Sequence, residues 1–96
     1  MRTHGSSREQ IAEEVKEAIK SCLEASGRRM PMLRGDQRPL TSISGFDSLC
    51  AIEVTVDLQE RLAVRLEGNV FVKAVGGKSE PRTLDEVVDD LFDEAN

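Results

Sequence analysis

The strongest constraint on the fold lies near the end of the chain, where residues 84–95 repeat apolar side chains with the period of an α-helix. Thr83 and Glu86 have the spacing of a capping box, which predicts that the helix begins directly after Thr83. The apolar face comprises Leu84, Val87, Val88, Leu91, Phe92 and Ala95, and acids fill the other face. Such a helix must bury its apolar face against other elements of the same domain.

Two earlier segments also have helical periodicity. Residues 8–25 place Ile11, Val15, Ala18, Ile19, Cys22 and Leu23 within one stripe. Asp47 is a good N-cap residue, and a helix is predicted to follow it over 48–62. That helix buries one apolar set, formed by Ala51, Val54, Leu58 and Leu62. Since 96 residues allow one small core, we expect a single domain over 8–96 and a disordered tail over 1–7.

The two connecting segments are less regular. Residues 28–46 contain Pro31 and Pro39, which break any helix, so we expect a long ordered loop that lays apolar residues over the core. Residues 70–75 are apolar and β-branched, but they stand without a partner strand. A short helix or irregular element that packs Phe71 or Val72 inward is therefore favoured, followed by a flexible turn over 76–81. The predicted class is all-α: a small bundle of three main helices, with a short or irregular third element and a long first loop.

Charge and composition exclude several classes of function. The net charge is −5, and residues 42–96 hold twelve acids against five basic residues, which argues against a nucleic-acid-binding domain. This half would attract a basic partner, although acids also simply keep a surface soluble. No stretch is apolar enough for a membrane span, and the first ten residues lack the apolar region of a secretory signal, so a cytoplasmic location is expected.

No metal site is predicted from the spacing of ligand-type residues. Cys22 and Cys50 fit neither a disulfide framework nor a metal-binding motif, and His4 is the single histidine of the chain. Helical spacing spreads the acids of 89–93 around a face, so a tight calcium site is not expected there either.

Ser48 is the residue with the clearest chemical potential. It follows the capping Asp47, so its hydroxyl is expected beside the unpaired N–H groups and the positive dipole end of a helix. Both would stabilise a phosphate ester formed on that hydroxyl. The ordinary alternative is that a serine at a helix start is only part of the cap.

Residues on both sides of Ser48 form a longer pattern. It runs Ser42-Ile43-Ser44-Gly45-Phe46-Asp47-Ser48-Leu49, then Ala51-Ile52-Glu53, then Asp57-Leu58-Gln59-Glu60-Arg61-Leu62. This pattern resembles the acyl carrier protein family, in which an Asp-Ser-Leu triplet opens the second helix. The resemblance covers about residues 8–94 and extends to the order of helices and loops. It implies that Ser48 carries a 4′-phosphopantetheine arm, with Asp47 and Leu49 as its motif neighbours.

The resemblance also implies the partners of the chain. A phosphopantetheinyl transferase would load the arm from coenzyme A, and acyl-transferring or condensing enzymes with basic patches would use it. Glu53, Asp57 and Glu60 match the acidic face that such enzymes read, and Leu49 and Val56 match the apolar contacts beside it. A non-catalytic monomer that carries acyl thioesters in fatty-acid, polyketide or related lipid synthesis is therefore expected.

Three departures from the family favour a specialised carrier. Ser44 stands where many members have leucine, the loop of 27–40 is unusually basic, and 68–82 is longer than usual. An unmodified helical adaptor with a carrier-like fold is the alternative. A serine hydrolase is disfavoured, because it needs a histidine base and His4 lies in a polar tail.

Overall fold

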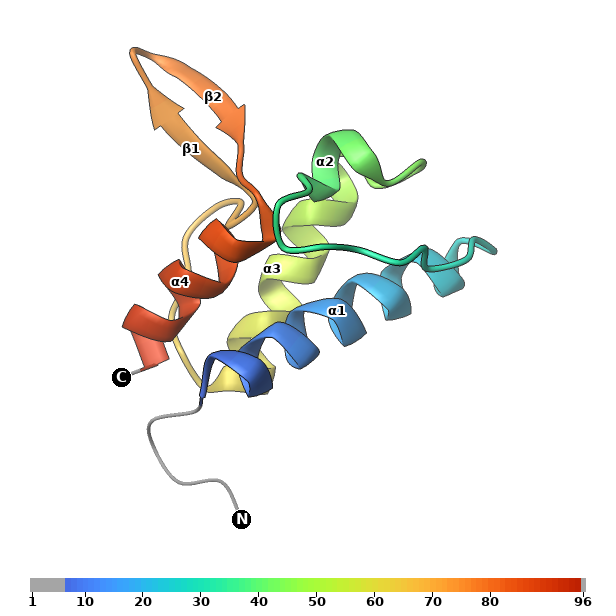
Figure 1. The fold of residues 1–96 in the computed structure, drawn as a ribbon, viewed down its shortest axis with the longest axis horizontal. Helices are drawn as coiled ribbons and strands as arrows, with labels where there is room; N and C mark the ends of the chain where they lie inside the picture. The colour runs from blue at the N-terminus through green and yellow to red at the C-terminus, as the bar shows by residue number, and fades with distance from the viewer. Residues whose placement is uncertain (1–6, 96) are drawn as a thin grey trace.

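A computed structural model describes residues 7–95 and confirms the three predicted main helices. They are α1 (Arg8–Ala25), α3 (Ser48–Leu62) and α4 (Leu84–Ala95). Helix α1 crosses the molecule and packs against both α3 and α4, as Figure 1 shows. Each helix turns its predicted apolar residues inward, and the core includes Ile11, Val15, Ile19, Leu58, Val87 and Leu91.

The segment that follows α3 corrects the all-α prediction. Strands β1 (Val72–Val75) and β2 (Lys78–Pro81) pair antiparallel as a hairpin that projects from the helices (Figure 1). Gly76 and Gly77 connect them with φ of 56° and 80°, the positive values that a two-residue type I′ turn requires. The chain is thus mostly helical with one small sheet. The partner strand was not predicted because Lys78–Pro81 is polar and mostly exposed, without an alternating apolar face.

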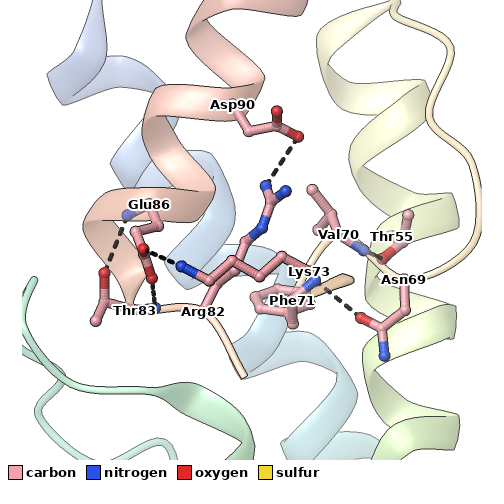
Figure 2. A network of polar contacts seen from close by, with 9 residues as sticks. All are labelled: Thr55, Asn69, Val70, Phe71, Lys73, Arg82, Thr83, Glu86 and Asp90. Atoms are coloured by element: carbon pink, nitrogen blue, oxygen red, sulfur yellow. Dashed lines mark hydrogen bonds and ion pairs between the residues drawn. The ribbon is translucent and has the colours of Figure 1, made fainter. Parts of the chain in front are cut away.

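Buried polar contacts fix the base of this hairpin to α3 (Figure 2). Thr55 of α3 is buried, and its Oγ1 donates to the Ala51 carbonyl at 2.8 Å while accepting from the Val70 N–H at 3.1 Å. The Arg82 N–H donates to the Phe71 carbonyl at 2.8 Å, which continues the pairing past β2. Of the two residues predicted to pack inward, Phe71 is fully buried and Val72 is half-buried.

The capping box at the start of α4 is confirmed, and its Glu86 also contacts strand β1 of the hairpin (Figure 2). The Glu86 N–H donates to Thr83 Oγ1 at 3.1 Å, and the Thr83 N–H donates to the Glu86 carboxylate at 2.8 Å. Lys73 of β1 donates to the same carboxylate at 3.0 Å. These contacts lower the pKa of Glu86 to about 2, with the Thr83 N–H as the largest cause and the Lys73 ammonium as the next.

The long first loop is ordered and contains a short helix that was not predicted. Helix α2 (Pro39–Ser42) begins with Pro39, a position where a proline fits because its missing N–H has no helical partner. The prediction that Pro39 breaks any helix was therefore wrong. Leu33 and Ile43 are buried in the core, as expected for a loop that covers it, whereas Met32 is 92% exposed.

The loop also satisfies the backbone at the start of α4. The carbonyls of Gln37 and Gly35 accept hydrogen bonds, each of 2.9 Å, from the N–H groups of Leu84 and Asp85. The Asp85 carboxylate lies against Gly35, so a Cβ at this position would make that exposed side chain move aside. The basic loop is thereby tied to the C-terminal helix.

Helix α1 begins at Arg8, as predicted, and Ser7, which was assigned to the disordered tail, belongs to its cap. Ser7 caps α1 and forms a capping box with Gln10, with bonds of 3.1 Å and 3.0 Å. Residues 1–6 of the predicted tail, which include His4, lie outside the described residues. Within 7–95, none of the helices is long and apolar enough to cross a membrane.

A substitution at the end of α3 tests the backbone geometry there. Ala63 terminates the helix with φ 54° and ψ 44°, a left-handed conformation that costs an L-residue about 1–2 kcal/mol. We expect Ala63→Gly to raise the free energy of unfolding by about 0.5–1 kcal/mol, measured by urea denaturation. Ala74→Gly in β1 is the control, and it should lower stability because its backbone is extended. A loss of stability in Ala63→Gly would contradict the left-handed assignment.

Candidate functional site

Ser48 is the first residue of α3 and is exposed. Asp47 precedes it as the predicted N-cap, and its side chain accepts the Cys50 N–H at 3.0 Å. This bond lowers the pKa of Asp47 below its ordinary value, so the carboxylate stays ionised at the positive end of the helix dipole. The structure thus places the predicted serine and aspartate together at a capped helix start.

The residues that precede the cap are anchored in the core. Phe46 is 2% exposed and its ring meets Phe71 edge-on, with ring centroids 5.2 Å apart and an interplanar angle of 81°. Gly45 has φ 85°, which turns the chain into the helix, and a Cβ there would also collide with the Arg28 side chain. Ser48 follows Phe46 by two residues. Its exposed hydroxyl therefore lies close in the chain to a side chain that is fixed in the core.

An exposed apolar stripe follows Ser48 along α3. Leu49 is 65% exposed, Ile52 45% and Val56 50%. Offsets of three and seven residues place all three on one helical face. Leu49 and Val56, which the resemblance implies as apolar contacts for a partner, are thus exposed and do not belong to the core. Ile52 was not predicted as a member of this stripe, although it lies three residues after Leu49.

The predicted acidic face lies on α3, but its members differ in what they contact. A Glu53 carboxylate oxygen lies 3.7 Å from the Cys22 thiol of α1. Asp57 pairs with Arg61 at 3.1 Å, and Arg61 also donates to Glu14 of α1 at 3.1 Å. Glu60 is exposed. Two of the three acids therefore also contribute to contacts that support α3, besides any role toward a partner.

Two cysteines that are distant in sequence meet where α1 and α3 cross. The sulfurs of Cys22 and Cys50 and a Glu53 carboxylate oxygen all lie within 4.8 Å of one another. The pKa of Cys22 is raised to about 12. Burial is the largest cause, and the hydrogen bonds and charges of Cys50 and Glu53 add to it. Sequence spacing could not reveal this cluster, because it depends on how the two helices cross.

Ser48 is exposed at the start of α3, with exposed apolar side chains beside it. A serine nucleophile needs an adjacent base, commonly histidine, and residues 7–95 contain no histidine. What the described residues do supply is an exposed hydroxyl, a helix N-terminus and a neighbouring apolar stripe. These features would allow a second protein to reach and modify the hydroxyl.

No family model matches the chain, and neither a curated protein nor a solved structure matches it.

Substitution of the cap residue tests how the start of α3 is held. Asp47→Ala removes the acceptor of the Cys50 N–H and should lower Tm at pH 7. Asp47→Asn keeps a side-chain oxygen that can accept this hydrogen bond, so its Tm should stay close to that of the wild type.

The same pair of variants has a defined pH dependence. Because the folded-state pKa of Asp47 lies below its unfolded value of about 3.9, its stabilisation is complete above that pH and is lost as the pH falls further. Thermal unfolding at several pH values should show the gap between wild type and Asp47→Ala narrowing below about pH 4. A gap that stays constant down to strongly acidic pH would contradict a charged cap.

Proposed function

We propose that the protein is an acyl carrier protein that bears a 4′-phosphopantetheine arm on Ser48. The observation that carries this proposal is the exposed Ser48 at the start of α3, directly followed by the exposed stripe Leu49, Ile52 and Val56. A carrier needs a hydroxyl that a transferase can reach, and beside it a surface that several enzymes can contact in turn. The resemblance of the surrounding sequence to acyl carrier proteins points to the same residue.

The residues at the site fit a phosphodiester. Ser48 Oγ would form the bond to the phosphorus of coenzyme A that bears pantetheine, while the P–O bond to adenosine 3′,5′-bisphosphate breaks. The serine proton would pass to a base of the transferase. The N-terminus of α3 then favours the phosphodiester charge. The terminal thiol of the bound arm supplies the chemistry, since it holds acyl groups as thioesters.

Partner enzymes would approach the same face of α3. The acids Glu53, Asp57 and Glu60 would attract their basic patches, and the apolar stripe would provide a short-lived contact. The encounter would be fast and salt-sensitive, which suits a monomeric carrier that visits several enzymes of fatty-acid, polyketide or related lipid synthesis in the cytoplasm.

A second candidate function is an unmodified helical adaptor. The exposed stripe on α3 favours it as well, because an apolar face can dock onto a partner without an arm. The two functions differ in whether Ser48 is modified, so one loading experiment separates them.

Loading should depend on Ser48 and not on other exposed serines. The protein would be incubated with a fluorescent coenzyme A analogue and a broad-specificity phosphopantetheinyl transferase, and label transfer followed on a gel. Ser48→Ala should abolish labelling, since the acceptor oxygen is gone, and should leave the helical circular dichroism unchanged. Ser44→Ala is the matched control, because Ser44 is also exposed and lies in the same connection.

Labelling of Ser48→Ala at the wild-type rate would show that the site assignment is wrong. No labelling of the wild type, with a known carrier labelled in the same tube, would favour the adaptor.

The apolar stripe should determine how well the transferase recognises the chain. We expect Val56→Ser to lower kcat/KM for loading by about tenfold, which corresponds to about 1.4 kcal/mol of lost contact. Val75→Ser is the control, since Val75 is an apolar residue of similar exposure on the hairpin. Equal kinetics for the two variants would exclude α3 as the recognition face.

A further inference from the structure

Helices α1 and α3 bring three potential metal ligands together beside the start of α3. Cys22 comes from α1, whereas Cys50 and Glu53 are one helical turn apart on α3. The Cys22 sulfur lies 3.7 Å from a Glu53 carboxylate oxygen, and the three ligand atoms all lie within 4.8 Å of one another. No part of the proposed carrier function uses these two sulfurs.

We infer that Cys22, Cys50 and Glu53 form a binding site for a thiophilic divalent metal ion, with Zn²⁺ the best match. Zinc prefers thiolate and carboxylate ligands in a tetrahedron, with Zn–S distances of about 2.3 Å. That geometry requires ligand atoms about 3.8 Å apart. The observed separations, all within 4.8 Å, exceed this value by at most about 1 Å.

The fourth coordination position would face a pocket between α1 and α3. This pocket has a volume of about 260 Å³ and is lined by two of the three ligand residues, Cys22 and Glu53, together with the polar residues Ser21, Ser26 and Asp57. A water bound to the metal could hydrogen-bond to these groups. Three protein ligands and one exchangeable position describe an open site rather than a closed structural one.

Charge at the cluster also favours a cation. On binding, both thiols lose their protons to solvent, so two thiolates and one carboxylate neutralise the divalent ion and leave one negative charge. Without a cation these anionic forms would repel one another at short range, and a divalent ion placed between them would remove that repulsion. Binding would link α1 to the first turns of α3, and it does not depend on modification of Ser48.

Co²⁺ is the probe, because coordination by thiolates gives a sulfur-to-metal charge-transfer band. The full chain, reduced and kept free of oxygen, would be titrated with Co²⁺ and then with Zn²⁺. We expect a band with the intensity of two thiolates, saturation at one ion per chain, displacement by Zn²⁺ and a higher Tm with Zn²⁺ present.

Variants assign the ligands. Cys22→Ser and Cys50→Ser should each halve the band and weaken Zn²⁺ binding by at least the roughly 10- to 100-fold that loss of a supporting residue costs. Glu53→Gln should keep the band but weaken binding. Glu13→Gln, at an exposed acid of α1, should leave both the Co²⁺ band and the Zn²⁺ affinity unchanged. Circular dichroism verifies that each variant is folded.

Absence of the band in reduced wild-type protein would overturn the inference. So would a band of full intensity in either cysteine variant, or equal binding by Glu53→Gln and the wild type. Formation of a Cys22–Cys50 disulfide in air, with no Co²⁺ band after reduction, would identify a redox pair and exclude the metal site.

Discussion

The edge-to-face packing of Phe46 on Phe71 joins the parts of the molecule on which the candidate site depends. Phe46 belongs to the connection that leads into α3, and Phe71 lies at the base of the hairpin, yet their rings meet at 5.2 Å inside the core. Buried aromatic rings contribute large apolar areas, and this pairing geometry adds about 0.5–1.5 kcal/mol. The contact therefore fixes where α3 begins, and with it the position of Ser48.

Hydrogen bonds across segments distant in sequence complete this support. Thr55 holds the chain at the start of the hairpin, and the carbonyls of Gly35 and Gln37 satisfy the first N–H groups of α4. Unpaired backbone groups at helix ends and buried turns are costly, so each of these bonds removes a penalty while it connects two elements. Ser48 is thus exposed to solvent at the start of a helix whose neighbouring segments are fixed to one another by these hydrogen bonds.

The parts of the fold that depend on local pattern could be predicted from the sequence. Helical periodicity located the three main helices, and the Thr83–Glu86 box and the Asp47 cap were predicted from residue type and spacing alone. The hairpin was missed because β2 is polar and mostly exposed, so its pairing depends on the turn glycines and the fixed base rather than on an apolar face. The cysteine cluster depends on how α1 and α3 cross, which no spacing along the chain encodes. At the candidate site, the helix start at Ser48 and its Asp47 cap could be predicted from residue type. The exposure of Leu49 and Val56 and the contact of Glu53 with Cys22 depend on how the helices pack, so the sequence did not determine them.

The central claim is that Ser48 is a point of attachment, supported from the core and open to a modifying enzyme. Tandem mass spectrometry of the wild-type chain, after incubation with coenzyme A and a phosphopantetheinyl transferase, tests it most directly. The account predicts a gain of one phosphopantetheine, with fragment ions that locate it on Ser48. A gain on another serine, or an unchanged mass while a known carrier is loaded in the same tube, would contradict it.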